Sequence, residues 1–184
     1  DEHVESYYTH GYCVFRKLIP PTLLDELRVM AEKARVICHE KSGPQAQRLQ
    51  PISKFDLDLK PYHEYATLPN LVEAIEVLFH GQARYAYTPT NTIIAGILFE
   101  PKNKAWCTVW HRDWRDNAPG IDINIWADKM LDWHLFNQVN TPLYDDGSTW
   151  VVPGSHLRPD LTREIERFPD RPITGPKLSP EMNN

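Results

Sequence analysis

An imidazole and a carboxylate two positions apart are the side chains in this sequence best suited to bind a metal. His111 and Asp113 follow the strand-like residues Val109 and Trp110, and on a strand residues i and i+2 point to the same face. They are two of the three ligands of the 2-His-1-carboxylate triad, which leaves adjacent positions on Fe(II) open for a cosubstrate and for O2. The tripeptide alone is also compatible with a surface histidine beside an unrelated aspartate.

The chain before Gly81 has the pattern of helices. Apolar residues recur at three- and four-residue spacing across 23–37, directly after Pro20 and its neighbouring proline, which predicts a long helix. A second helix is predicted over about 71–79, because the apolar pattern there stops at Gly81. Residues 40–60 are polar and are predicted to be irregular.

The chain after Gly81 changes to β-branched and aromatic residues interrupted by turns. Strand composition is found in the segments 85–99, 106–110, 122–126, 134–140 and 149–152. Helices followed by many short strands predict an α+β protein, mainly β, whose β part is a sandwich or a jelly roll.

Composition excludes several classes of protein. Hydrophobic residues make up 41% and charged residues 24%, which is ordinary for a globular domain of 184 residues. The formal net charge of -5 gives no basic footprint, so nucleic acid is not expected as a partner. The longest apolar run, 93–99, is too short to cross a bilayer. The three cysteines form no C-x-x-C pair, and a reducing cytoplasm is the expected compartment.

Three further segments accompany the His111 motif in a fixed order. Before the long predicted helix the chain carries the run His10-Gly11-Tyr12-Cys13-Val14-Phe15, and the second predicted helix ends at Phe79-His80-Gly81. The metal motif is Trp110-His111-Arg112-Asp113, and Gly147 is followed by Val151-Val152-Pro153-Gly154-Ser155-His156. In these four elements and in their order, the chain resembles the phytanoyl-CoA dioxygenase family over nearly its whole length.

The resemblance implies a double-stranded β-helix, the cupin-like jelly roll, with N-terminal helices packed on it. It also implies Fe(II) as the metal and 2-oxoglutarate as the cosubstrate. His111 and Asp113 match the metal ligands of the family. Gln138 and Asn140 share one face of the strand predicted over 134–140 and are expected near 2-oxoglutarate.

Two residues that the family uses are not found in this sequence. One is a distal histidine that completes the metal site, and the other is an arginine that pairs with the far carboxylate of 2-oxoglutarate. Both are expected after Asn184, because 169–184 is a Pro-rich polar stretch without a helix or strand signal. The chain is therefore expected to be one dioxygenase domain, incomplete at its C-terminus, with a mainly helical part at 1–81 and the first strands of the jelly roll at 82–184.

The function implied by the resemblance is hydroxylation of a small-molecule or acyl substrate, with consumption of O2 and release of succinate and CO2. Asp113 favours hydroxylation over halogenation, because related halogenases carry a small residue at that position. Two other interpretations stay open: a catalytically silent relative that acts as a binding module, and a cupin-like protein that uses zinc or manganese without 2-oxoglutarate. The substrate is not encoded in any motif of the chain.

Overall fold

The computed structural model describes residues 2–81, 95–100, 110, 138–158 and 161–167. The chain divides into two compact units. One comprises residues 1–14, 105–141 and 146–184, and the other comprises residues 15–104 and 142–145. Each unit is described by itself below, beginning with the second, which contains the long helix.

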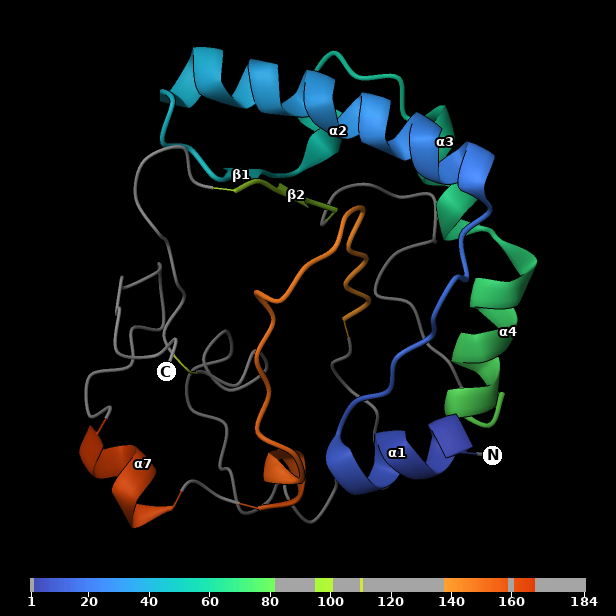
Figure 1. Cartoon of the computed structure of the whole chain (residues 1–184), viewed down its shortest axis with the longest axis vertical. Coiled ribbons are helices and arrows are strands. Elements are labelled where there is room, and N and C mark those ends of the chain that lie inside the picture. Colours follow the sequence, from blue (N-terminus) through green and yellow to red (C-terminus); the bar gives the residue numbers. More distant parts are fainter. Residues whose placement is uncertain (1, 82–94, 101–109, 111–137, 159–160, 168–184) are drawn as a thin grey trace. The chain divides into compact units, whose positions relative to one another are not determined.

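Helix α2 (Pro21–Ser42) is the longest element of the second unit (Figure 1). It begins with Pro21 in its first turn, where the missing N–H of proline has no intrahelical partner to lose. Its buried residues recur every three or four positions and so form one apolar face: Leu23, Leu27, Met30, Ala34 and Cys38. The helix ends at Gly43, which has a φ of 89° and donates its N–H to the His39 carbonyl at 2.9 Å. The helix predicted from the apolar spacing is therefore confirmed and extends beyond residue 37.

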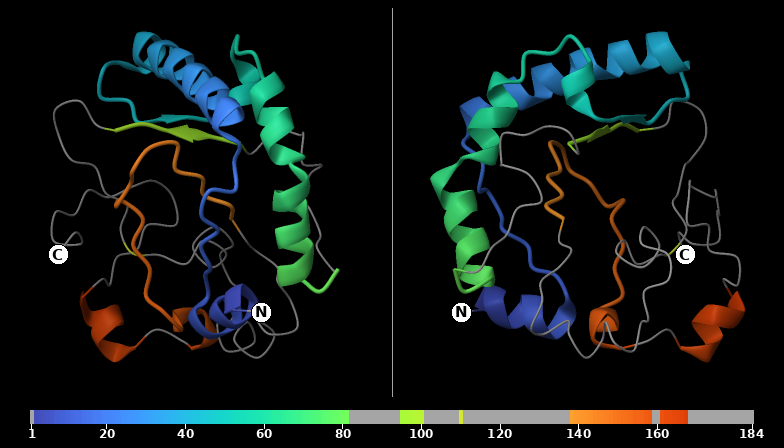
Figure 2. Two further views of the ribbon diagram at one scale, coloured as in Figure 1. Left: turned by 45° about the vertical axis from the view of Figure 1, so that its right-hand side comes forward. Right: turned by 180° about the vertical axis from the view of Figure 1, so that it is seen from behind.

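A short antiparallel sheet packs against this helix. Strand β1 (Arg48–Leu49) pairs with β2 (Ile97–Leu98), with Arg48 opposite Leu98 and Leu49 opposite Ile97. Ladder-like hydrogen bonds continue on both sides, from Phe99 N–H to the Gln47 carbonyl at 2.9 Å and from Ile52 N–H to the Ala95 carbonyl at 3.1 Å. Helix α2 lies beside β1 (Figure 2). Ala34 and Cys38 of its apolar face form one buried cluster with Leu49 of β1.

The described part of the second unit also contains three further helical segments. They are the 3-10 turn η1 (Ile52–Lys54) and the helices α3 (Lys60–Ala66) and α4 (Pro69–Leu78). Tyr62 and Tyr65 of α3 pack against the buried cluster of Leu23, Leu27 and Met30. Helix α4 confirms the second predicted helix, whereas η1 lies in the stretch 40–60 that was predicted to be irregular, and α3 follows that stretch where no element was predicted.

The described part of the first unit contains three helical segments. Helix α1 (Glu2–His10) has no buried residue. The 3-10 turn η2 (Ser155–Leu157) and helix α7 (Thr162–Arg167) come from the other end of the sequence.

The predicted fold class, a mainly β protein with a cupin-like jelly roll, is wrong. In the residues that the structure describes, helices predominate and the β structure is a single sheet of two strands. Residues 138–140 and 149–152, both predicted as strands, are exposed and belong to neither helix nor strand. Strand propensity reflects how well a side chain fits a half-buried pleated surface, so β-branched residues without such a surface do not form a sheet. The predicted strands at 106–109, 122–126 and 134–137 lie outside the described residues.

Membrane insertion was tested on the described helices. Within those segments, no helix combines the length and the apolar character that a bilayer crossing requires.

Arg28 fixes the segment 142–145 to α2. Its Nε donates to the Leu143 carbonyl at 2.8 Å, its Nη1 bonds Asp25 Oδ1 at 3.0 Å, and its guanidinium carbon lies 4.9 Å from the centre of the Tyr144 ring. Lysine has no Nε donor and no planar face to stack. We expect Arg28→Lys to lower the free energy of unfolding by about 1–2 kcal/mol, measured by urea denaturation.

Arg35 provides the matched control for this substitution. It lies on the same helix, but its partner is Glu32 one turn away, and both side chains are exposed. Such pairs contribute little to stability, so Arg35→Lys should leave the urea midpoint unchanged. Equal midpoints for the two variants would show that Arg28 does not anchor the segment.

Cys38 is expected to resist alkylation in the folded protein. Its side chain is 1% exposed, and its thiol donates to the Arg48 carbonyl at 3.4 Å. Burial raises the pKa of this thiol, so less of the reactive thiolate exists at pH 8. Peptide mapping after iodoacetamide treatment should find Cys38 modified only in denaturant. Cys13 is partly exposed and should react faster, and equal rates at both positions would contradict the buried placement of Cys38.

Candidate metal and cosubstrate residues

The two predicted metal ligands, His111 and Asp113, lie outside the described residues. The structure describes Trp110, directly before them, as partly buried. Gln138 and Asn140, the predicted cosubstrate residues, are exposed and belong to no strand, so the shared strand face predicted for them is not formed. Their role toward 2-oxoglutarate, like the metal role of His111 and Asp113, stays a prediction.

Among the described residues, no group of three or more His, Cys, Asp or Glu side chains is arranged to hold a metal ion. The donor set of the His111 motif is chemically suited to iron, because one imidazole nitrogen and one carboxylate oxygen are two of the three ligands in the 2-His-1-carboxylate triad.

Two of the four sequence elements that suggested the function are in contact within the first unit. His156, in the Pro-Gly-Ser-His turn, places its ring Nε2 3.0 Å from the Tyr8 carbonyl. That carbonyl can only accept, so Nε2 carries the hydrogen of this bond. The N–H of Gly154 donates to the His10 carbonyl at 3.0 Å. The turn therefore satisfies two of the carbonyls that the last turn of α1 leaves without intrahelical partners.

Gly11 allows this contact to form. It follows the last residue of α1, has a φ of 85°, and donates its N–H to the Tyr7 carbonyl at 2.9 Å. A Cβ atom at this position would lie 2.5 Å from Nδ1 of His156 and 2.9 Å from its Cγ. Only glycine combines this backbone conformation with so close an approach of an imidazole ring. We call the contact of residues 8–11 with residues 154–156 the glycine–histidine clasp.

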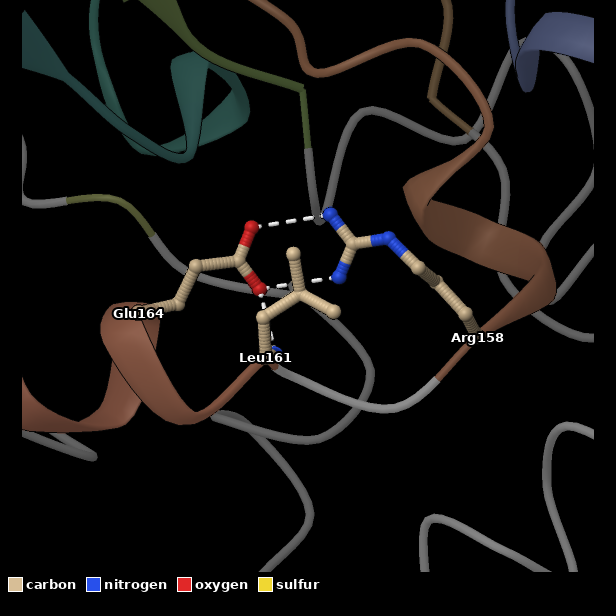
Figure 3. Close-up of polar contacts among 3 residues, drawn as sticks. All are labelled: Arg158, Leu161 and Glu164. Atoms are coloured by element: carbon tan, nitrogen blue, oxygen red, sulfur yellow. Dashed lines mark hydrogen bonds and ion pairs between the residues drawn. The ribbon is translucent and has the colours of Figure 1, made fainter.

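Arg158, directly after η2, is held in an ion pair (Figure 3). Its Nη1 and Nη2 donate to Glu164 Oε2 and Oε1, both at 2.8 Å, and both side chains are partly buried. Glu164 Oε2 also accepts the N–H of Leu161 at 2.7 Å, which caps the first turn of α7. A guanidinium group is suited to bind the carboxylate of a ligand, but here the guanidinium is already engaged by Glu164.

Sequence reasoning identified the two halves of the clasp but not the contact between them. The Gly11 run and the His156 turn were both recognised as motifs. The signal for the contact was the glycine itself, because a glycine one residue beyond a helix indicates a left-handed cap or a close approach. The anchor at Arg28 was not predicted. Its signal is the apolar pair Leu143 and Tyr144 inside an otherwise polar loop.

Comparisons with known proteins found no relative of this chain. No family model matches the sequence, no curated protein is similar to it, and no solved structure is similar to it.

Proposed function

We propose that this chain belongs to an Fe(II)- and 2-oxoglutarate-dependent dioxygenase that hydroxylates a small-molecule or acyl substrate, with release of succinate and CO2. The observation that carries the proposal is the order of Trp110-His111-Arg112-Asp113 and the later Pro153-Gly154-Ser155-His156. The clasp adds support, because the run around Gly11 and the turn at His156 were selected from sequence alone and are in contact. Because the predicted jelly roll is wrong, the fold does not support the proposal.

His111 and Asp113 would hold the ferrous ion through one imidazole nitrogen and one carboxylate oxygen. A bound ferrous ion and 2-oxoglutarate supply the oxidising chemistry, and the protein contributes placement and exclusion of water. The negative charge of Asp113 would balance part of the charge of the metal. Because a carboxylate occupies this position, hydroxylation is favoured over halogenation. The triad needs a second imidazole, which the motif in this chain does not contain.

We also propose a cytoplasmic location, because the three cysteines of the sequence form no C-x-x-C pair and no disulfide pattern. Small-molecule substrate and O2 are the partners that the proposed reaction requires. The formal net charge of -5 does not indicate the clustered lysines and arginines that bind the phosphates of nucleic acids.

Anaerobic addition of Fe(II) and then 2-oxoglutarate to the full protein tests the proposal. We expect a visible charge-transfer band that saturates at one equivalent of each. Succinate is the matched control, because it lacks the 2-oxo group that chelates the metal, and it should give no band. The His111→Ala variant should also give none.

The same titration separates the two alternatives. A protein that binds zinc or manganese tightly but gives no band with Fe(II) and 2-oxoglutarate is a cupin-like metal protein. A protein that binds none of these metals is a catalytically silent binding module. Either result would overturn the proposed function.

A further inference from the structure

We draw no further inference here: the strongest candidate, the exposed apolar segment formed by Trp150, Val151 and Val152 ahead of the Pro153-Gly154 turn, carries nothing because the described part of the chain does not show what covers it.

Discussion

Replacing Asp113 with alanine is expected to abolish the decarboxylation of 2-oxoglutarate by the full protein. The substitution removes the only carboxylate of the proposed triad, so the metal loses both a ligand and a compensating negative charge. Loss of a residue that merely orients a ligand costs roughly 10–100-fold in affinity or activity, and loss of the ligand itself should exceed that. The measurement is CO2 released from 2-oxoglutarate labelled at its 1-carboxylate, which requires no knowledge of the substrate.

Asp116→Ala is the matched control for this prediction. Asp116 is a carboxylate three positions beyond Asp113 that does not belong to the His111-Arg112-Asp113 motif. We expect the Asp116 variant to release CO2 at the wild-type rate, and both variants should have the circular dichroism spectrum of the parent protein. If Asp113→Ala keeps wild-type turnover with the same Fe(II) requirement, Asp113 is not a metal ligand and the proposal is wrong.

Helices were predictable because their signals are local. In α2 the proline start and the apolar spacing from Leu23 onward lie within one stretch of sequence, so the pattern reports the buried face directly. Helix α3 was missed because it is only 7 residues long, too short for an apolar period to be recognised. Its position depends on Tyr62 and Tyr65 packing against α2, and that contact is not visible from local sequence.

Strands were predicted poorly because a strand needs a partner that local sequence does not specify. Thr149, Trp150, Val151 and Val152 have high strand propensity, but in the structure they are exposed and join no described sheet. Conversely, β1 consists of Arg48 and Leu49 within a polar stretch, and it forms because Ile97 and Leu98 pair with it from about 50 residues away. Neither its register nor its existence could be derived from composition.

For the candidate site too, features of the local sequence could be predicted and tertiary contacts could not. The proposed metal role of His111 and Asp113 could be read from the sequence, because it depends only on the two residue types and on their spacing of two positions. The clasp joins Tyr8 to His156 across 148 positions, and a contact of that range follows from tertiary structure alone. Arg158 pairs with Glu164 only six positions along the chain, and this contact was not predicted either.

Replacing Gly11 with alanine is expected to destabilise the first unit by about 2–5 kcal/mol. Two effects add: a left-handed backbone with a Cβ atom costs about 1–2 kcal/mol, and forcing extra atoms into a packed contact costs about 1–3 kcal/mol. The new Cβ would lie 2.5 Å from Nδ1 of His156, so either the ring or the end of α1 must move. Urea denaturation followed by circular dichroism measures the change.

Alanine substitutions at two other glycines of the first unit allow the backbone effect to be measured without the packing effect. Gly154 has a φ of 73°, and a Cβ there would meet only the Thr9 carbonyl at an ordinary 3.7 Å, so Gly154→Ala should show the backbone effect of about 1–2 kcal/mol alone. Gly147 has no such φ and nothing within 4 Å of a Cβ, so Gly147→Ala should change stability by less than about 0.5 kcal/mol.

A double variant then tests whether the ring is the cause of the larger effect. In Gly11→Ala combined with His156→Ala, the imidazole that the new Cβ would meet is absent, so the loss of stability should be smaller than the sum of the two single losses. Strict additivity, together with equal losses for Gly11→Ala and Gly154→Ala, would show that His156 does not pack on Gly11. Such a result would also remove the structural support that the clasp gives to the proposed dioxygenase. The order of the sequence motifs would then be its sole basis.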